Sequence, residues 1–295
     1  MKLLVTGASG FVGRRFLEMA PTDWEIVCLG RSQPANLTER WIQCDLSDQE
    51  SVESAAKKVS DETFDAVVHL AAFVPKTAAD DTLENARLGN IDATINLLTY
   101  FGEKSEKIII GSTAEVYDQS KIHGPITEDN VVAGGSYYGS TKMASELIAQ
   151  SYAKKMNKEL TVLRFSVMYG GYDPIARAIP NFIRAAKTGE DLTIRGAKVL
   201  RDYIHIDDVA RSIICAVNAD GAGGVVNIGT GRGVSIRETA QAIVDSTQST
   251  SRIAVLSEDG GSDIVIDISR AEKLLNYHPE VFFPDKLKEM EELYE

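Results

Sequence analysis

The sequence predicts an α/β fold with a doubly wound parallel sheet and a second, smaller α/β part. Two observations support this: apolar strand-like runs alternate with helical stretches through the first half of the chain, and a glycine-rich turn follows the first run. Such alternation is typical of parallel sheets with helices on both faces. The 295 residues are enough for one large domain of this class, or for such a domain with an appendage.

The first strand is expected at Lys2–Thr6, and a helix should begin at Arg14. Between them lies a turn with three glycines, each three residues from the next. In a strand–turn–helix unit the first glycine permits the tight turn, the second lets backbone approach a pyrophosphate, and the third lets the helix pack on the sheet. The amides and dipole at the helix start would attract the phosphates. This spacing favours a Rossmann-type dinucleotide site formed by Gly7, Gly10, Phe11, Val12 and Gly13.

The second strand, Glu25–Leu29, is where the choice of cofactor should show. An acidic residue at its end would bind the ribose hydroxyls of NAD. The chain instead continues with Gly30, Arg31 and Ser32, and the last two could hold a ribose 2′-phosphate. This favours NADP(H) and leaves NAD as the second choice. Arg31 as a solvated loop residue is the alternative interpretation.

The next two strands should place further residues beside the cofactor. The stretch 41–46 contains an acid that could contact the adenine amino group, and the stretch 65–72 runs into small side chains that leave room for a cofactor. His69 is expected to be a packed histidine at a strand end rather than a catalyst. The expected contacts from this region and from a following long helix, 82–101, are Asp45, Leu46, Leu70, Ala71, Ala72 and Asn90.

A fifth strand, Lys107–Gly111, is followed by Ser112, Thr113 and Glu115. A hydroxyl or carboxylate just past a central strand lies at the carboxyl end of the sheet, where ligands bind in such folds. A sixth strand, Glu159–Phe165, completes the alternation. We therefore expect the polar side chains after the fifth strand to face a ligand.

The stretch from Ser136 to Lys142 places a phenol and an ammonium four residues apart at the start of a helix. Residues at this spacing share a face, so Tyr138 and Lys142 should lie together. A tyrosine has an ordinary pKa of about 10, and a neighbouring cation, reinforced by a cationic nicotinamide ring, favours the phenolate. Tyr138 would then serve as an acid or base near neutral pH. Its neighbour Tyr137 has Thr141 at that spacing instead of a cation.

Beyond Ser166 the pattern changes, with a turn-rich link from Tyr169 to Pro174 and shorter, less regular elements. Residues 1–166 are therefore expected to form the dinucleotide-binding domain. Residues 167–295 should form mainly a substrate-binding domain, with segments near 202–230 returning to the first domain.

The composition argues against several kinds of partner. The formal net charge is −12, from 31 basic and 43 acidic residues, and no basic run occurs, so nucleic acid is not expected to bind. Cys28, Cys44 and Cys215 are widely separated and fit reduced core thiols of a cytoplasmic protein. The chain opens on a strand and has no apolar run of membrane-spanning length, so we expect neither a signal peptide nor an anchor. No bound metal is expected.

Together these motifs carry a family resemblance that covers essentially the whole chain. The residues and stretches concerned are Gly7, Gly10, Gly13, Thr113, Tyr138, Lys142, 69–72, 90–94, 201–208, 227–231 and 267–275. The chain resembles the extended short-chain dehydrogenase/reductase family, the epimerases, dehydratases and ketoreductases of nucleotide sugars. The resemblance implies a catalytic triad. Thr113 would hydrogen-bond the reacting sugar oxygen, Tyr138 would move its proton, and Lys142 would bind the nicotinamide ribose and lower the pKa of the tyrosine.

Departures from the family pattern bear on the reaction. Dehydratases of the family that use an Asp-Glu pair after the threonine have their general acid at the place of Ala114, so this type of dehydratase is not expected. Glu115 remains either a second base or a hydrogen-bonded loop carboxylate.

The residues expected to hold the substrate also depart from the pattern. Arg201 matches the first of two arginines that bind the diphosphate in the family, but the second, expected before an acid near Asp263, is missing. Arg195 replaces an aromatic residue that often stacks on the nucleotide base, and it could stack or bind phosphate. The expected substrate contacts are Ser112, Thr113, Glu115, Asn181, Arg195 and Arg201.

Three functions are consistent with these features. The first is an NADP(H)-dependent ketoreductase acting at C4 of a nucleotide-diphosphate deoxysugar, favoured by the triad together with Arg31. The second is a redox-neutral 4-epimerase that holds NAD tightly, and a remote third is a non-catalytic NADP-binding regulator. By resemblance we also expect a homodimer, in which helices 82–101 and 136–156 of both copies form a four-helix bundle.

Overall fold

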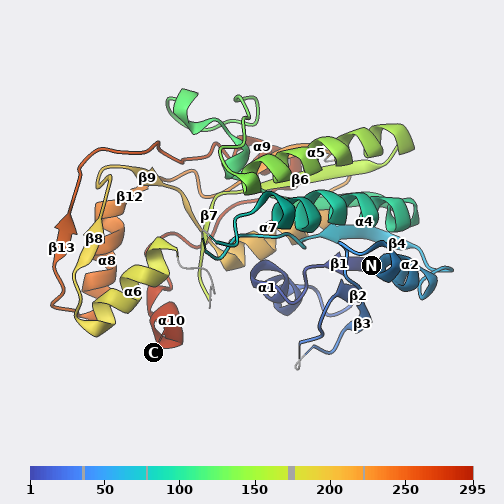
Figure 1. Cartoon of the computed structure of the whole chain (residues 1–295), viewed down its shortest axis with the longest axis horizontal. Coiled ribbons are helices and arrows are strands. Elements are labelled where there is room, and N and C mark those ends of the chain that lie inside the picture. Colours follow the sequence, from blue (N-terminus) through green and yellow to red (C-terminus); the bar gives the residue numbers. More distant parts are fainter. Residues whose placement is uncertain (35–36, 78, 172–176, 222, 295) are drawn as a thin grey trace.

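A computed structural model describes residues 1–34, 37–77, 79–171, 177–221 and 223–294, and its larger part is built on one sheet (Figure 1). The seven strands are all parallel and lie in the order β11-β6-β5-β4-β1-β2-β3. Their bounds are Lys2–Thr6 (β1), Glu25–Gly30 (β2), Arg40–Gln43 (β3), Phe64–His69 (β4), Ser105–Thr113 (β5), Glu159–Phe165 (β6) and Gly224–Ile228 (β11). The predicted α/β class with a doubly wound parallel sheet is confirmed.

Helices cover both faces of this sheet because successive side chains of a strand point to opposite faces. Leu3 and Val5 of β1 pack with Phe16, whereas Leu4 packs in a separate cluster with Val52 and Leu97. One face carries α1 (Phe11–Met19), α7 (Ile206–Asn218) and α9 (Ser269–Leu275), and the other carries α2 (Gln49–Lys57), α4 (Ala93–Phe101) and α5 (Tyr137–Met156).

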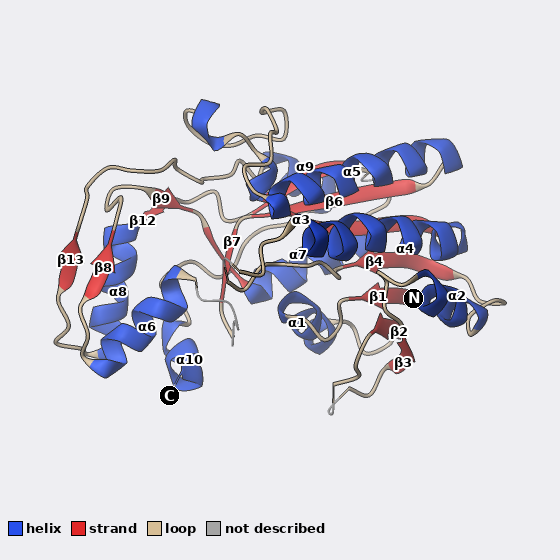
Figure 2. Ribbon diagram, in the orientation of Figure 1, coloured by secondary structure: helices blue, strands red, loops and turns tan. Residues whose placement is uncertain are grey.

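The smaller part lies to the left in Figure 2 and has its own core. Its aromatic side chains Tyr169, Tyr203 and Phe283 pack against one another with ring centroids 5.1–6.4 Å apart. Its strands form three pairs, and the bounds of its elements are Val167–Tyr169 (β7) with Tyr203–His205 (β10), Leu192–Ile194 (β8) with Ile253–Val255 (β13), Leu200–Arg201 (β9) with Val234–Ser235 (β12), and the helices Ala178–Thr188 (α6), Ile236–Thr247 (α8) and Leu287–Glu291 (α10). Residues 172–174 of the predicted turn-rich link lie outside the described residues.

Several predicted element bounds are wrong. The first helix begins at Phe11, directly after Gly10, and the fourth strand ends at His69, although the amide of Leu70 still donates to the carbonyl of Thr6. The long helix predicted over 82–101 is divided into α3 (Leu83–Ala86), a π-helical turn (Arg87–Asp92) and α4. Single-turn 3₁₀ helices span Gly102–Lys104, Ala114–Val116, Gln119–Lys121 and Glu292–Tyr294.

The π-helical turn has an identifiable cause. The carbonyl of Asn90 accepts hydrogen bonds from the hydroxyls of Thr94 (2.7 Å) and Ser145 (3.0 Å), so it bonds to side chains of two helices. Gly89 lies so close to Phe73 that a Cβ would be 2.4 Å from the Phe73 Cβ. π-helical turns within α-helices are frequently found at functional sites.

All three cysteines are free, and two of them are buried. Burial raises the pKa of the Cys28 thiol to about 12 and that of Cys44 to about 11. Such thiols are unreactive. In the part of the chain that the structure describes, no helix combines the length and the apolar composition needed to cross a membrane.

The turn after β1 leads to a prediction about stability. Gly7 and Gly189 share a φ of +74°, but a Cβ at Gly7 would lie 2.5 Å from the Ala71 nitrogen, whereas one at Gly189 has no heavy atom within 4 Å. Each change to alanine should cost about 1–2 kcal/mol for the left-handed backbone, and Gly7→Ala about 1–3 kcal/mol more for the clash. Urea unfolding of both variants measures this difference. Equal losses of unfolding free energy in the two variants would show that the clash at Gly7 costs no stability.

Candidate active site

The turn between β1 and α1 has the geometry of a phosphate cradle. A Cβ at Gly13 would lie 2.2 Å from the carbonyl oxygen of Gly7, so internal packing requires glycine there. A Cβ at Gly10 would meet one heavy atom only, at 3.1 Å, so glycine there mainly leaves the backbone open to approach. Gly10 is the N-cap of α1, and no side chain of the described residues caps it. The first amides of the helix are thus oriented to bind an anion, and the residues fit the pyrophosphate of a dinucleotide.

A chain of buried hydrogen bonds fixes the loop after β4 beside this turn. The amide of Ala71 donates to Oγ1 of Thr6 (3.2 Å), and that hydroxyl lies 2.7 Å from Nδ1 of His69. On the other side of the ring, Nε2 lies 3.2 Å from Oγ1 of Thr94, which itself donates to the carbonyl of Asn90. This directional pattern fits a neutral imidazole with its proton on Nε2.

The environment of His69 supports the same protonation state. Burial, and secondarily the charge of Lys142, lower the pKa of His69 to about 3. A permanently neutral, fully hydrogen-bonded ring has no proton to exchange near neutral pH, so the prediction of a packed histidine is confirmed.

The side chain of Asn90 joins this loop to α5. Its Oδ1 accepts from the amide of Phe73 (2.8 Å), and its Nδ2 donates to Oγ1 of Thr141 (2.9 Å) and to the carbonyl of Phe73 (3.3 Å). Asn90 is 1% exposed, and both its Oδ1 and its Nδ2 form hydrogen bonds within the protein. Asn90 therefore holds the loop after β4 against α5. Its direct contact with the cofactor stays a prediction.

The triad predicted from the sequence comes from two neighbouring elements. Thr113 ends β5, and its Oγ1 accepts from the amide of Glu115 (3.2 Å). Ser136 caps α5 by accepting from the amide of Gly139 (3.0 Å), and a Cβ at Gly139 would lie 2.7 Å from the Glu115 carbonyl oxygen. The end of β5 thus packs directly on the first turn of α5, which places Thr113 near the half-buried Tyr138.

The charges around Tyr138 differ from those predicted. Burial raises the pKa of the phenol above its ordinary value, the Glu115 carboxylate raises it further, and the Arg177 guanidinium and the Thr113 hydrogen bond oppose this. Among the described residues, Lys142 is not one of the groups that shift this pKa. The lowering of this pKa by Lys142 together with a bound, oxidised nicotinamide stays a prediction.

Lys142 is itself strongly affected by its surroundings. Its side chain is 3% exposed, and burial lowers the pKa of its ammonium to about 8, against the opposing charge of Glu146. The lysine therefore loses its proton close to physiological pH. An amine in this condition can donate hydrogen bonds to a ligand in either protonation state.

Glu115 shares the site with Tyr138. Its surroundings raise the pKa of its carboxyl, while the Arg177 charge and a long hydrogen bond from Ser136 (Oγ to Oε2, 3.5 Å) lower it. Part of the side chain is nevertheless exposed to solvent. Glu115 is thus a carboxylate that an incoming substrate can reach.

Arg31, one of the two residues predicted to select the cofactor, borders a cavity of about 410 Å³ at the carboxyl ends of β2 and β3. Arg31 and Ser32 are exposed, and Oδ1 of Asp45 accepts from the amide (3.0 Å) and hydroxyl (2.7 Å) of Ser47. Leu46 is buried in the core beneath. The cavity is lined by Arg31, Gln43, Asp45, Ser51, Ser54 and Lys58. It combines two cations with several hydroxyls, as a phosphate-bearing ligand would require.

Two of the predicted substrate residues on the smaller part, Asn181 and Arg201, bond to other residues of that part. Nη1 of Arg201 donates to the carbonyls of Leu200 (2.9 Å) and Ser262 (2.7 Å), and Asn181 accepts from Arg184 (3.1 Å). Arg195 is exposed just after β8. The structure thus places Arg201 at the loop where the second arginine is missing, with part of its donor capacity already used.

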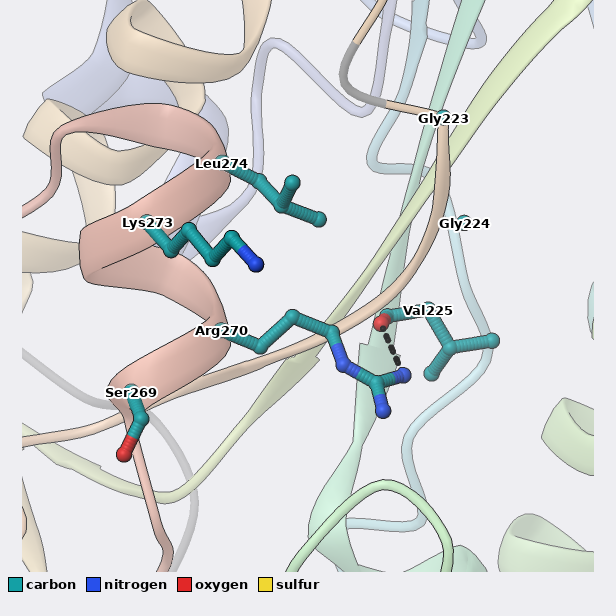
Figure 3. Close-up of a pocket in the computed structure, with 7 residues that line it drawn as sticks. All are labelled: Gly223, Gly224, Val225, Ser269, Arg270, Lys273 and Leu274. Atoms are coloured by element: carbon teal, nitrogen blue, oxygen red, sulfur yellow. Dashed lines mark hydrogen bonds between the residues drawn. The ribbon is translucent and has the colours of Figure 1, made fainter.

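A second cavity, of about 390 Å³, lies between α9 and the start of β11 (Figure 3). Arg270 points across it and donates to the carbonyl of Val225 (3.3 Å), and Lys273 extends from the same helix. Gly224 pairs with Thr161 at the amino end of the sheet, whereas Thr113 pairs with Phe165 at the carboxyl end. This cavity is therefore not part of the triad site.

Two residues of the site were not predicted from the sequence. Arg177 is the N-cap of α6 and acts on both Tyr138 and Glu115, but nothing in the local sequence indicates which site its helix faces. Glu146 continues the four-residue spacing of Tyr138 and Lys142, and that repeat was a usable signal.

The comparisons with known proteins agree with this arrangement. Residues 3–229 match the model of the NAD dependent epimerase/dehydratase family. A UDP-N-acetyl-alpha-D-glucosaminuronate decarboxylase of Bacillus cytotoxicus is 28% identical over 98% of this chain and 96% of its own. A dTDP-4-dehydro-6-deoxyglucose reductase of Escherichia coli is 25% identical over 98% of this chain and 96% of its own. The crystal structure of a UDP-glucuronic acid 4-epimerase from Bacillus cereus in complex with NAD superposes over 100% of both chains, with a TM-score of 0.85 and 27% identity.

The family match spans well over half of the chain and includes the glycine turn and all three residues of the triad. The relatives are enzymes that match over nearly their whole length. The chain therefore belongs to the NAD-dependent epimerase/dehydratase family of enzymes, the group that its sequence motifs resemble.

Proposed function

We propose that this protein changes the oxidation state of C4 in a nucleotide-linked sugar, using a nicotinamide dinucleotide held by the turn after β1. The observation that carries the proposal is the packing of the end of β5, which carries Thr113, on the start of α5, which carries Tyr138 and Lys142. When bound, the nicotinamide supplies the hydride chemistry, and its oxidised ring adds positive charge near the phenol.

The three side chains have distinct roles in this proposal. The Thr113 hydroxyl hydrogen-bonds the sugar oxygen at the reacting carbon, and Tyr138 accepts or returns the proton of that oxygen. Lys142 donates to the nicotinamide ribose. Because burial and Glu115 keep the phenol protonated in the protein alone, Tyr138 is ready as an acid. It becomes a base when added positive charge lowers its pKa.

4-Epimerisation with retained NAD is the first reaction to test. A relative that matches this chain over its full length is a UDP-glucuronic acid 4-epimerase solved with NAD. Another is a decarboxylase of a UDP-linked uronic acid. Oxidation at C4 is common to both reactions, since a 4-keto group makes the C6 carboxylate of a uronic acid a β-keto acid. The Ala114 position still argues against the dehydratases that use an Asp-Glu pair.

Ketoreduction with NADPH is the second candidate, and one specific observation favours it. Arg31 borders the cavity at the ends of β2 and β3, with Lys58 on its other wall, and no acid follows β2 where NAD would be recognised. A relative of this chain is a dTDP-4-dehydro-6-deoxyglucose reductase. Both candidates use the same triad and differ in whether the cofactor leaves after each turnover.

Tyr138→Phe should lower turnover by roughly 10²–10⁴-fold, because it removes the positioned acid or base and nothing else. Cofactor affinity measured by calorimetry should be unchanged. The matched control is Tyr137→Phe, since Tyr137 is 48% exposed and should tolerate loss of its hydroxyl. Epimerisation of UDP-sugars with NAD and reduction of 4-keto sugars with NADPH are the assays. Full activity in Tyr138→Phe would sink the role given to this residue.

Glu115→Gln should lower the pKa of Tyr138, because the carboxylate is a charge that raises it. Ultraviolet titration of tyrosinate, with the curve of the corresponding Tyr138→Phe protein subtracted, isolates this phenol from the other tyrosines. Asp118→Asn removes a nearby carboxylate that does not act on Tyr138 and is the control. An unchanged midpoint in Glu115→Gln would mean that the two side chains do not interact.

Arg31→Ala should weaken NADPH binding by roughly 10- to 100-fold, the value of a hydrogen-bonded charge pair, and leave NADH binding unchanged. Lys57→Ala, an exposed cation of α2 outside the cavity, is the control. Calorimetry with both coenzymes gives the affinities, and the cofactor carried through purification should be identified alongside. Equal weakening for NADPH and NADH would refute contact between Arg31 and a 2′-phosphate.

A further inference from the structure

Glu146 is a buried carboxylate close to the proposed triad. It lies on α5 and is 1% exposed. The spacing of four residues puts it on the same face as Lys142, one helical turn further into the protein. A charge with so little solvent contact is costly unless it is paired and hydrogen-bonded. Its partners therefore show what it is there to hold.

The partners of Glu146 come from two adjacent strands of the sheet. Arg164 of β6 donates from Nη2 to Oε2 (2.7 Å) and from Nε to Oε1 (3.1 Å), and the hydroxyl of Ser112 on β5 donates to Oε1. Ser112 and Arg164 are direct neighbours in the parallel register of these strands. One carboxylate thus bonds simultaneously to both strands from the helix that lies over them. We refer to Glu146, Arg164 and Ser112 as the clamp.

The clamp acts directly on the proposed catalytic geometry. Ser112 immediately precedes Thr113, and Glu146 follows Tyr138 by two turns on the same rigid helix. The relative position of the Thr113 hydroxyl and the Tyr138 phenol is therefore set by the contact of β5 with α5. Across that contact, Glu146 makes buried hydrogen bonds to Ser112 and Arg164 with its charged carboxylate.

The other side of Arg164 is fixed as well. Its guanidinium carbon lies 4.7 Å from the ring centroid of Tyr117, and the Tyr117 hydroxyl donates to Oδ1 of Asn227 (2.6 Å) on β11. A cation over an aromatic face is attracted to the ring. Arg164 is thus held by Glu146 on one side and by the Tyr117 ring on the other, which fixes the position of the guanidinium that binds Glu146.

Glu146 also acts on Lys142 by charge. Burial lowers the pKa of Lys142 to about 8, and the Glu146 carboxylate is the charge that opposes this lowering. Arg164 of β6 pairs with that carboxylate. The same side chain therefore joins strand to helix and contributes negative charge one turn from the proposed cofactor-binding lysine.

We propose that Glu146 is a positioning residue for the C4 chemistry: through the clamp it sets Thr113 against Tyr138, and it places a carboxylate one helical turn from Lys142. The inference rests on the proposed function for its kinetic consequence only. The effect on Lys142 requires no substrate and no cofactor.

The test compares Glu146→Gln and Glu146→Asp with a matched control. Asp208 is a buried carboxylate that is paired with Arg211. It accepts hydrogen bonds from the amides of Glu280 (3.0 Å) and Val281 (2.9 Å) and lies on α7, away from the triad. Asp208→Asn therefore removes a similar buried charge pair without touching the clamp. Thermal unfolding of all variants shows how much stability each one loses.

The first readout is the pH dependence of carbamylation of Lys142 by cyanate, followed by mass spectrometry, which reports the protonation of the amine directly. In the wild type the midpoint should lie near pH 8. Glu146→Gln should move it to lower pH, because the charge that raises the pKa of Lys142 is gone. Glu146→Asp and Asp208→Asn should keep the wild-type midpoint. An unmoved midpoint in Glu146→Gln would overturn the electrostatic half of the inference.

The second readout is kcat against KM for the sugar substrate. Glu146→Gln should lower kcat by roughly 10²-fold, the scale of an ångström-sized misplacement, with little change in KM. Glu146→Asp retracts the carboxylate by one methylene and should also lose kcat, while Asp208→Asn should keep it. If Glu146→Gln does not fold, Glu146→Asp decides: wild-type kcat in that variant would overturn the positioning role. A wild type with no turnover of any nucleotide sugar would sink the proposed function instead, and the cyanate midpoint would still test Glu146.

Discussion

The close approach of the β1 turn to the loop after β4 is the constraint on which the rest of the site depends. Gly7 lies against the Leu70–Ala71 peptide, with no space for a side chain between them. Thr6 then reaches both the Ala71 amide and the His69 ring. Because the ring is neutral and fully bonded, the contact is maintained without a buried charge. The candidate phosphate cradle and the loop after β4 are thus fixed as one unit.

From this unit, polar side chains extend to the helix that carries the proposed acid or base. Asn90 bonds the backbone at Phe73 on one side and Thr141 of α5 on the other. Glu146 bonds α5 to the end of β5. Tyr138 and Lys142 are therefore positioned by contacts on two sides of their helix, which explains how a residue as long as lysine can be 3% exposed and still be ordered at a ligand site.

The sequence was sufficient for features that depend on local pattern. Apolar runs between turn residues located the strands of the large sheet, and β6 has the predicted bounds of Glu159–Phe165. The π-helical turn was not predictable, since the carbonyl of Asn90 within it accepts a hydrogen bond from Ser145, 55 positions further along the chain. The pKa of Tyr138 could not be predicted for the same reason. The lysine at the right spacing was visible, but the charges that dominate come from Glu115 and Arg177 on other segments.

The smaller part has a hydrophobic core of its own, formed around Tyr169, Ile183 and Tyr203 and separate from the clusters under the large sheet. Of its candidate substrate residues, Arg195 directly follows β8 and Arg201 ends β9. On the proposed function, substitutions there would alter which sugar or nucleotide is accepted without disturbing the proposed triad. Such independence lets members of one family diverge in specificity while keeping a common chemistry. It also means that overall similarity to a relative says less about the substrate of this protein than the few side chains on that surface do.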